Sequence, residues 1–331
     1  MLSQPELNTL LKNDKIDHFL LIRRLELRST RSGNDFLSTE LGDKTISLNA
    51  NVWEGFTSIA SKAKVGDVVK VEGTIEEYQN TLQIRVNSIR LATTDDEISP
   101  KDFLPRSKRE LKIMKDEFKK RIDNISDKFI KKLLKQIFSG KRFEQFCNAP
   151  AGKSWHHAYI SGLIEHTLEI IKICELMCEF HPELNKDLLI AGAMLHDIGK
   201  IEELSYDSAF EYTDKGKLLG HIVIAANLVL DEIKKIPDFP QQLENNLVHL
   251  ILSHQGKLEH ASPVVPKTAE AIALYQADEL SAKVNAYKNV IDTEGKTDSS
   301  WTRFIQLANT DLFKSNLENS FEESANKSLF D

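Results

Sequence analysis

Cysteine is scarce in this chain: its 331 residues include only three, Cys147, Cys174 and Cys178. An odd number cannot form an even disulfide framework. Cys174 and Cys178 stand four residues apart on one predicted helix face, where we expect them to pack as small hydrophobic residues in a reducing compartment. A structural zinc site there would need two further soft ligands, and none stands at a suitable spacing.

Long apolar runs are also missing. The segment 188–195 is far shorter than a membrane span, and residues 1–6 contain no basic segment followed by an apolar one. We therefore predict a cytoplasmic protein that does not enter a membrane. A glycine-rich phosphate loop is absent too, since Ser139-Gly140-Lys141 lacks the preceding glycine of a P-loop. Hydrophobic residues make up 41% of the chain and charged residues 28%, which is typical of a soluble protein with room for two domains.

Positive charge is in the minority and unevenly distributed. The net charge of −7 argues against a protein that coats nucleic acid indiscriminately. Residues 107–155 hold 14 basic against 6 acidic side chains, a net charge of +8, whereas residues 156–331 hold 15 against 28, a net charge of −13. A carboxylate excess is expected around a cation site, and a basic stretch before it would guide a polyanion inward. The alternative is an ordinary solvated helix face between domains.

Residues 16–92 have the pattern of short strands separated by turns. Turn signals stand at Gly42-Asp43, Val65-Gly66-Asp67 and Gln79-Asn80. Five strands with a helix after the third is the order of the OB-fold, a five-stranded β-barrel. The expected strands are 18–22, 36–41, 45–50, 68–75 and 81–86, and the expected helix is 52–64.

An OB barrel binds single strands through basic and aromatic side chains on its open face. Phe36 and Trp53 could equally belong to the core, so burial and base stacking stay equal alternatives for these aromatic residues. The candidates are Arg23, Arg28, Arg31, Phe36, Lys44, Trp53 and Tyr78.

The rest of the chain is predicted to be helical. Residues 93–106, with an acidic run and two prolines, have the composition of an interdomain linker. Apolar residues at helical spacing over 107–138 predict a helix pair, and four to six further helices follow, interrupted by a hairpin at 202–217. Residues 316–331 are rich in serine, asparagine and glutamate and are expected to fray.

The fold class is therefore multidomain α+β, with an N-terminal OB-fold barrel followed by an all-α helix bundle. The bundle carries the candidate metal ligands. The predicted segments are 1–15 (N-terminal segment), 16–95 (OB-fold), 96–150 (linker and basic helices), 151–310 (metal-binding helical domain) and 311–331 (C-terminal tail).

A His-Asp doublet, His196-Asp197, ends an apolar helical run. Adjacent imidazole and carboxylate groups at a helix end can both turn toward one divalent cation while the apolar face behind them holds the backbone. The alternative is a histidine at a helix C-terminus beside a solvated carboxylate. Further candidates on or beside predicted helices favour the metal site: His166 precedes the doublet, and His221, His254 and Asp278 follow it.

This order of residues resembles the metal-dependent HD phosphohydrolase superfamily over residues 151–290. The superfamily pattern is a helical His, a His-Asp doublet and a later helical Asp, with two more His in members that bind two metals. Other segments are similar to the YhaM family of 3′-5′ exoribonucleases, in which an OB-fold precedes the HD domain. They are His156-His157-Ala158-Tyr159 leading into 162–167, the segment 216–222, and Ser262-Pro263 with 266–271.

The resemblance implies a ligand set for one or two divalent ions. Mixed imidazole and carboxylate ligands suit Mn²⁺, with Fe²⁺ or Co²⁺ as alternatives, better than Mg²⁺. Lys200 is expected to contact the scissile phosphate. A first metal would be held by His166, His196, Asp197 and Asp278, with Asp197 as a bridge, and His221 and His254 would complete a second site.

On a continuous helix His157 would point almost opposite to His166. We therefore expect His156 and His157 to lie at the helix entrance and to touch substrate rather than share the metal, with ordinary packing as the alternative. Gln255 stands where the family often repeats His, and Ser281 stands where a second carboxylate often follows. These two departures leave the affinity of the second metal and the handling of substrate open.

The leading hypothesis, whose direction and RNA substrate are implied by the resemblance, is a metal-dependent 3′-5′ exoribonuclease that degrades single-stranded RNA to nucleoside 5′-monophosphates, with single-stranded DNA left open. A nucleotidase or cyclic-nucleotide phosphodiesterase is a second hypothesis, because HD sites accept many phosphate esters. A nucleic-acid-binding regulatory protein with an inert site is a third. The intact ligand set argues against the third and the OB segment against a purely small-molecule enzyme, while the oligomeric state stays undetermined.

Overall fold

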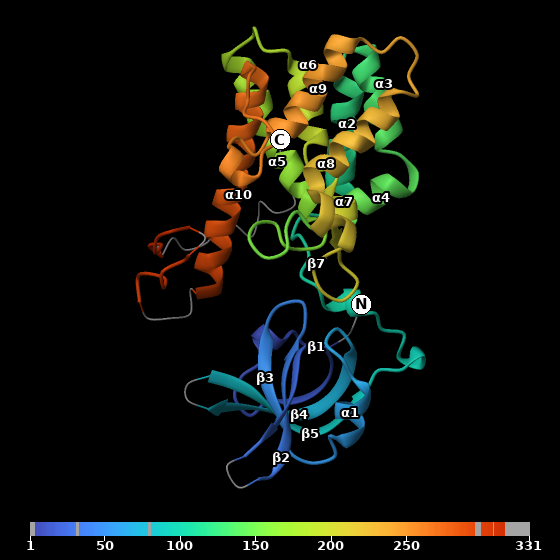
Figure 1. Cartoon of the computed structure of the whole chain (residues 1–331). Coiled ribbons are helices and arrows are strands. Elements are labelled where there is room, and N and C mark those ends of the chain that lie inside the picture. Colours follow the sequence, from blue (N-terminus) through green and yellow to red (C-terminus); the bar gives the residue numbers. More distant parts are fainter. Residues whose placement is uncertain (1–3, 31–32, 79–80, 295–298, 307, 315–331) are drawn as a thin grey trace. The chain divides into compact units, whose positions relative to one another are not determined.

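The computed structural model describes residues 4–30, 33–78, 81–294, 299–306 and 308–314. The chain divides into two compact units, one made of residues 1–105 with 206–209 and the other of residues 106–205 with 210–331. Strands make up most of the first unit and helices most of the second (Figure 1). Each unit is described by itself below.

The first unit is a closed barrel with the strand order β1-β2-β3-β5-β4. Neighbouring strands are antiparallel except β3 and β5, which pair in parallel. The short helix α1 follows the third strand, so the predicted OB-fold order is confirmed. The elements are β1 (Lys15–Ser29), β2 (Asp35–Gly42), β3 (Ser47–Val52), α1 (Thr57–Lys62), β4 (Val68–Tyr78) and β5 (Thr81–Leu91).

Alternating apolar residues on these strands fill the barrel. Leu20, Ile22, Val71, Ile75 and Ile84 are buried together, as expected where one face of each strand points inward. The predicted turn at residues 79–80 lies outside the described residues, as do Arg31 and residues 315–331 of the predicted tail.

The predicted linker is more ordered than its composition indicates. It contains two 3₁₀ turns, Thr94–Asp96 and Pro100–Phe103. Phe103 is buried against Leu21 and Val68 of the barrel. The end of this segment therefore packs as part of the first unit and is not an unstructured linker.

The second unit is a helix bundle around α5, which packs against α2, α4, α6 and α10. A two-stranded hairpin, β6 with β7, interrupts the helices where residues 202–217 predicted one. The elements are α2 (Leu111–Asn124), α3 (Lys128–Ile137), α4 (Gly140–Asn148), α5 (Gly162–Phe180), α6 (Lys186–Leu195), α7 (Lys200–Glu203), β6 (Leu204–Ser205), β7 (Glu211–Tyr212), α8 (Asp214–Ile233), α9 (Gln241–Ser253) and α10 (Ala269–Glu294).

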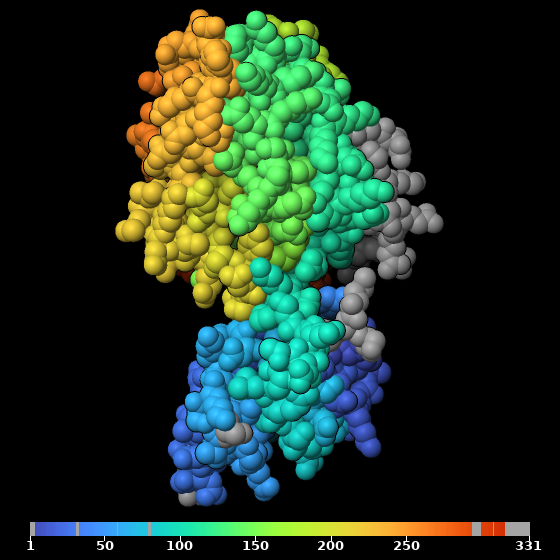
Figure 2. All heavy atoms as spheres, turned by 90° about the vertical axis from the view of Figure 1, so that its right-hand side faces the viewer, coloured from blue at the N-terminus to red at the C-terminus, as the bar shows by residue number. Residues whose placement is uncertain are grey.

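Side-chain caps begin several of these helices. Asp127 accepts hydrogen bonds from two amides in the first turn of α3, whereas Asn185 and Thr213 each accept from one amide in the first turn of α6 and α8. Helix α6 is apolar on every side because it lies inside the bundle, with each residue from Leu188 to Leu195 buried. In the space-filling view, side chains of α8 (yellow) lie beside those of α3 and α4 (green) (Figure 2).

Among the residues that the structure describes, no helix combines the length and the apolar character needed to cross a membrane.

Candidate metal centre

The His-Asp doublet lies directly after α6, at the buried end of that helix. His196 caps α6, and neither His196 nor Asp197 is exposed by more than 2%. The alternative of a solvated carboxylate beside a terminal histidine is therefore wrong. A buried carboxylate needs partners, and Asp197 has several.

Four imidazoles converge on Asp197. Its Oδ2 lies 3.2 Å from Nε2 of His196 and 3.8 Å from Nε2 of His166, a residue of α5. Its Oδ1 lies 3.4 Å from Nε2 of His221 on α8 and 3.7 Å from Nε2 of His254 at the end of α9. The structure thus brings together residues that are up to 88 positions apart in the chain.

These contacts define two overlapping ligand groups. We call His166, His196 and Asp197 the first group, and Asp197, His221 and His254 the second group. Within each group the potential ligand atoms lie within 4.8 Å of one another. Asp278 on α10 lies beside the first group, with Oδ1 3.0 Å from Nε2 of His166. All six residues of the predicted ligand set therefore lie in one cluster.

Main-chain features place the second group. Helix α8 is kinked at Gly220, whose φ of 71° and ψ of 152° suit glycine, and His221 begins the helical segment after the kink. The His221 amide donates to Oε1 of Glu203 at 2.9 Å. Gly199 packs so closely on α8 that a Cβ there would lie 2.1 Å from the His221 carbonyl oxygen. Contact between the backbones of Gly199 and α8 thus holds the His-Asp doublet close to His221.

The Nδ1 atoms of three imidazoles are engaged away from the cluster. Nδ1 of His196 lies 2.8 Å from the Ala193 carbonyl oxygen and Nδ1 of His254 lies 2.7 Å from the Ile251 carbonyl oxygen. Nδ1 of His221 lies 3.0 Å from Oε1 of Glu203. Carbonyl and carboxylate oxygens only accept, so each Nδ1 carries the hydrogen and each Nε2 keeps its lone pair toward the cluster.

The cluster fits a divalent cation by an independent criterion. Buried polar atoms normally have hydrogen-bond partners, yet among the residues that the structure describes four atoms facing the cluster have none: Nε2 of His166, His196 and His221, and Oδ1 of Asp197. A cation would satisfy imidazole lone pairs and carboxylate oxygen together. Nε2 of His254 is the exception, because the Gln255 side-chain amide lies 3.2 Å from it.

Ionisation of Asp197, His254 and His166 favours metal ligation, whereas at His196 the charge of Asp197 outweighs burial and raises the pKa, so a metal must displace a proton there. Burial opposes the charge of Asp197, but Lys200 and His196 hold its pKa well below the usual range. Nζ of the buried Lys200 lies 2.6 Å from Oδ2 of Asp197. Burial and the neighbouring His196 lower the pKa of His254 to about 4, and burial with the nearby His157 lowers the pKa of His166. These two imidazoles are therefore neutral near pH 7.

His156 and His157 lie in the loop before α5, so the argument from a continuous helix does not apply to them. The centroid of each ring lies 4.9 Å from that of His166, and the three side chains form a further group with ligand atoms within 4.8 Å. His157 is fully buried; among the described residues its Nδ1 has no hydrogen-bond partner, and its Nε2 lies 3.3 Å from Oε2 of Glu169. Its φ of 43° is unfavourable for a non-glycine residue, so surrounding contacts must hold it there.

Sequence reasoning missed two contributors around the cluster, Glu203 and Glu169, and left the role of a third, Ser281, open. Glu203 holds His221, and no sequence signal marks it. Ser281 contacts Nδ1 of His166 at 3.0 Å and donates to Glu169 at 2.6 Å. Glu169 stands three residues after His166, a spacing that places both on one helix face and would have revealed it.

The basic candidates of the barrel have partners of their own. Nη2 of Arg23 donates to the Phe103 carbonyl oxygen at 2.9 Å. Nε of Arg28 donates to Glu26 at 2.9 Å, and Nζ of Lys44 pairs with Glu6 at 2.8 Å. Arg23 therefore holds the segment around Phe103 against the barrel. Arg28 and Lys44, in contrast, form exposed ion pairs in which a phosphate could take the place of the glutamate carboxylate.

The aromatic candidates lie on the barrel surface. Phe36 and Trp53 stack with ring centroids 4.5 Å apart and an interplanar angle of 23°. Trp53 is 55% exposed and Tyr78 is 62% exposed. Of the two alternatives for Trp53, the structure favours the surface one.

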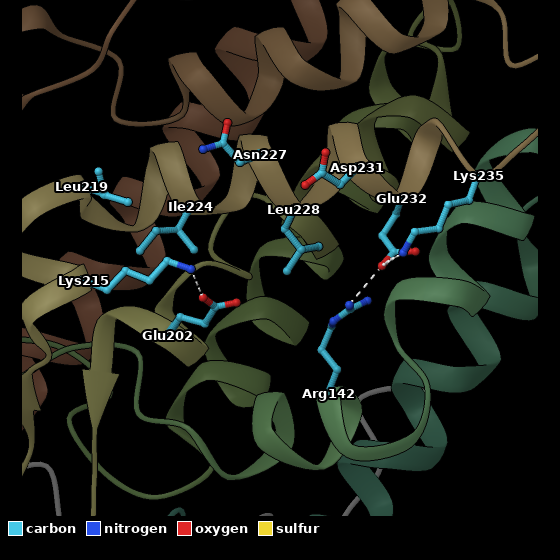
Figure 3. A pocket seen from close by; sticks show the side chains of 10 residues that line it. All are labelled: Arg142, Glu202, Lys215, Leu219, Ile224, Asn227, Leu228, Asp231, Glu232 and Lys235. Atoms are coloured by element: carbon cyan, nitrogen blue, oxygen red, sulfur yellow. Dashed lines mark hydrogen bonds and ion pairs between the residues drawn. The ribbon is translucent and has the colours of Figure 1, made fainter.

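A pocket of about 310 Å³ lies on the helical unit but does not include the ligand groups. Figure 3 shows its cations paired with carboxylates, Lys215 with Glu202 and both Arg142 and Lys235 with Glu232. With its charges compensated and no histidine in its lining, this pocket offers no metal chemistry. The ligand cluster is the candidate centre.

A buried His and Asp cluster in a helix bundle that accompanies an OB-fold defines an HD-domain metal phosphohydrolase with a nucleic-acid-binding module. The model of the HD domain matches residues 163–283, and the model of the OB-fold nucleic acid binding domain matches residues 22–92. The 3′-5′ exoribonuclease YhaM of Geobacillus sp. (strain WCH70) is 32% identical over 305 residues, which cover 91% of this chain and 92% of that protein. The chain belongs to the YhaM family of 3′-5′ exoribonucleases.

Further comparisons gave a second relative and a solved structure. YhaM of Listeria monocytogenes serotype 4b (strain CLIP80459) is 32% identical over 281 residues, which cover 84% of this chain and 88% of that protein. A domain of replication protein A from Methanococcus maripaludis is 21% identical, covers 26% of this chain and 92% of its own length, and has a TM-score of 0.23.

Proposed function

We propose that this protein is a metal-dependent 3′-5′ exoribonuclease that degrades single-stranded RNA to nucleoside 5′-monophosphates. The observation that carries the metal chemistry is the set of buried, unpartnered ligand atoms around Asp197. Direction and substrate class rest on the family. A bound divalent cation supplies charge neutralisation at the phosphoryl oxygens and activation of water. Mixed nitrogen and oxygen donors favour Mn²⁺, with Fe²⁺ or Co²⁺ as alternatives.

We assign the ligand roles as the resemblance implies them. His166, His196, Asp197 and Asp278 hold the first ion, and Asp197 with His221 and His254 holds a second. Asp197 is the only residue in both ligand groups and presents one oxygen to each. Lys200, whose ammonium already lies against Asp197, contacts the scissile phosphate.

His156 and His157 bind the substrate beside the first group. Their rings lie next to His166, and Nδ1 of each has no hydrogen-bond partner, so each can donate to a phosphate oxygen once protonated there. The strained backbone at His157 supports a functional role for this loop.

The barrel binds the single strand. The exposed Trp53, backed by Phe36, offers a flat face for a base, and base stacking contributes about 1–3 kcal/mol per base. Arg28 would bind phosphate. We keep the predicted limits of 16–95 for this domain and 151–310 for the catalytic one, and we propose a cytoplasmic location from the odd number of cysteines.

The proposal is tested with a 5′-labelled RNA hairpin that carries a single-stranded 3′ tail, incubated with the full chain and Mn²⁺. We expect shortening from the 3′ end, a stop near the stem because unpairing costs about 1.4 kcal/mol per step, and release of 5′-monophosphates. EDTA should abolish the reaction. Digestion through the stem, release of 3′-monophosphates, or hydrolysis confined to mononucleotides or cyclic nucleotides would overturn the proposal.

Substitution of Trp53 tests the barrel's part. Trp53→Ala should weaken binding of long single-stranded RNA about 5- to 150-fold, the equivalent of 1–3 kcal/mol, and leave hydrolysis of dinucleotides unchanged. Trp301→Ala is the matched control, because Trp301 is 51% exposed and also contacts a phenylalanine, Phe313. An equal effect of both substitutions on RNA affinity would argue against a specific stacking role.

A further inference from the structure

His166 differs from the other three imidazoles of the cluster in what its Nδ1 contacts. The partners of His196, His221 and His254 are oxygens that can only accept. The partner of His166 is the Ser281 hydroxyl, 3.0 Å away, which can accept or donate. The tautomer of His166 is thus not fixed by this contact alone.

The second contact of Ser281 removes that freedom. Its Oγ donates to Oε2 of Glu169 at 2.6 Å. A hydroxyl has one hydrogen, and an ionised carboxylate can only accept. The hydrogen of the Ser281 hydroxyl therefore points toward Glu169. The same oxygen can then only accept from Nδ1 of His166, and the lone pair of His166 must lie on Nε2, which faces Asp197 and Asp278.

The helix register makes the arrangement geometrically coherent. Asp278 and Ser281 stand three residues apart on α10, so this helix contacts both nitrogens of His166, Nε2 through Asp278 and Nδ1 through Ser281. Glu169 stands three residues after His166 on α5. Ser281 therefore connects His166 to a carboxylate supplied by the other helix.

We propose that Ser281 and Glu169 are positioning residues that fix His166 as the Nδ1-protonated tautomer, so that Nε2 is available as a metal ligand. Glu169 also lies 3.3 Å from Nε2 of His157, so the same carboxylate lies between the metal ligand and the loop before α5. This inference rests on the proposed metal-dependent function. Outer-shell partners of this kind typically contribute 10- to 100-fold to metal affinity.

Two substitutions break the arrangement in different ways. Ser281→Ala removes the acceptor for Nδ1. Glu169→Gln keeps the shape of the side chain but can offer a hydrogen to Ser281, which frees the hydroxyl hydrogen for Nδ1 and favours the wrong tautomer. Ser262→Ala is the control, because Ser262 is equally buried but bonds only to the carbonyl oxygens of Leu252 and Val264.

The test needs no RNA, so its failure is distinguishable from failure of the proposed exoribonuclease activity. Binding of Mn²⁺ to the metal-stripped full chain should weaken about 10- to 100-fold in Ser281→Ala and Glu169→Gln and stay unchanged in Ser262→Ala. Nitrogen-15 NMR of the metal-free chain should show His166 protonated at Nδ1 in the unsubstituted protein and a shift toward Nε2 protonation in Glu169→Gln.

The NMR measurement reports the tautomer of His166, and thermal unfolding reports general stability. The two together distinguish a positioning role from a purely structural one. Wild-type Mn²⁺ affinity in both variants would overturn the proposal. So would Nε2 protonation of His166 in the unsubstituted chain. If Ser281→Ala does not fold, the near-isosteric Glu169→Gln gives the decision alone.

Discussion

The two ligand groups share Asp197 but differ in how completely they are prepared for a cation. In the first group His166 and His196 are fully buried, and their Nε2 atoms lack hydrogen-bond partners. In the second group the His221 side chain is 17% exposed, and Nε2 of His254 lies within hydrogen-bond distance of the Gln255 amide. Preparation of a ligand lowers the free energy cost of binding, so we expect the first group to bind its ion more tightly.

The largest effect is expected at the shared carboxylate. Asp197→Asn should abolish tight binding at both groups and lower hydrolysis about 1000-fold or more, because several kcal/mol of charge stabilisation are lost. Isothermal titration with Mn²⁺ and turnover on single-stranded RNA measure the two effects.

Asparagine is preferred to alanine here, since it leaves an oxygen for the buried Lys200 ammonium. Removal of one partner of a buried ion pair costs about 3–5 kcal/mol of unfolding free energy. Asp197→Ala should therefore also lower the melting temperature. Loss of one binding event alone in Asp197→Asn would show that the groups do not share this residue.

Removal of one imidazole from each group tests their independence. His166→Gln should weaken the tighter binding event more than about 100-fold, beyond what an outer-shell partner contributes. His254→Gln should weaken only the second event. Titration of each full-length variant with Mn²⁺ resolves the two events, and a larger loss of the tighter event in His254→Gln would reverse the order that we infer.

A smaller effect, of opposite sign, is expected at Gln255. Gln255→Ala releases Nε2 of His254 from one hydrogen bond worth about 1 kcal/mol, so the second ion should bind about fivefold more tightly. The control is Gln276→Ala, an exposed glutamine on α10. Weaker binding of the second ion in Gln255→Ala would mean that the amide supports His254 rather than competing with the metal.

Local sequence patterns were sufficient for the architecture and marked the His-Asp doublet, whereas the full ligand set rested on the resemblance to the HD superfamily. Alternation and turn signals predict the barrel because one face of each strand must be apolar, and Gly42-Asp43 marks the end of β2. The doublet after an apolar run predicts a buried helix end, and α6 ends at Leu195.

Features that depend on contacts between distant segments were not accessible in this way. The stacking of Phe36 on Trp53 depends on the β2 and β3 register, in which Leu37 pairs with Val52. The burial of Phe103 in a segment of linker composition depends on the barrel surface that it meets. The role of Glu203 follows from helix packing that no local pattern encodes, whereas the three-residue spacing of Glu169 from His166 was a usable signal.

The close approach of Gly199 to α8 has a consequence for how sequences of this family can diverge. Because glycine backbone touches the His221 carbonyl directly, the separation of the doublet from His221 does not depend on the size of any side chain between them. Apolar residues elsewhere in the bundle can be replaced by apolar residues of different size while the ligands keep their spacing. A methyl group at position 199, in contrast, must displace α8. Substitution of Gly199 even by alanine should therefore not be tolerated.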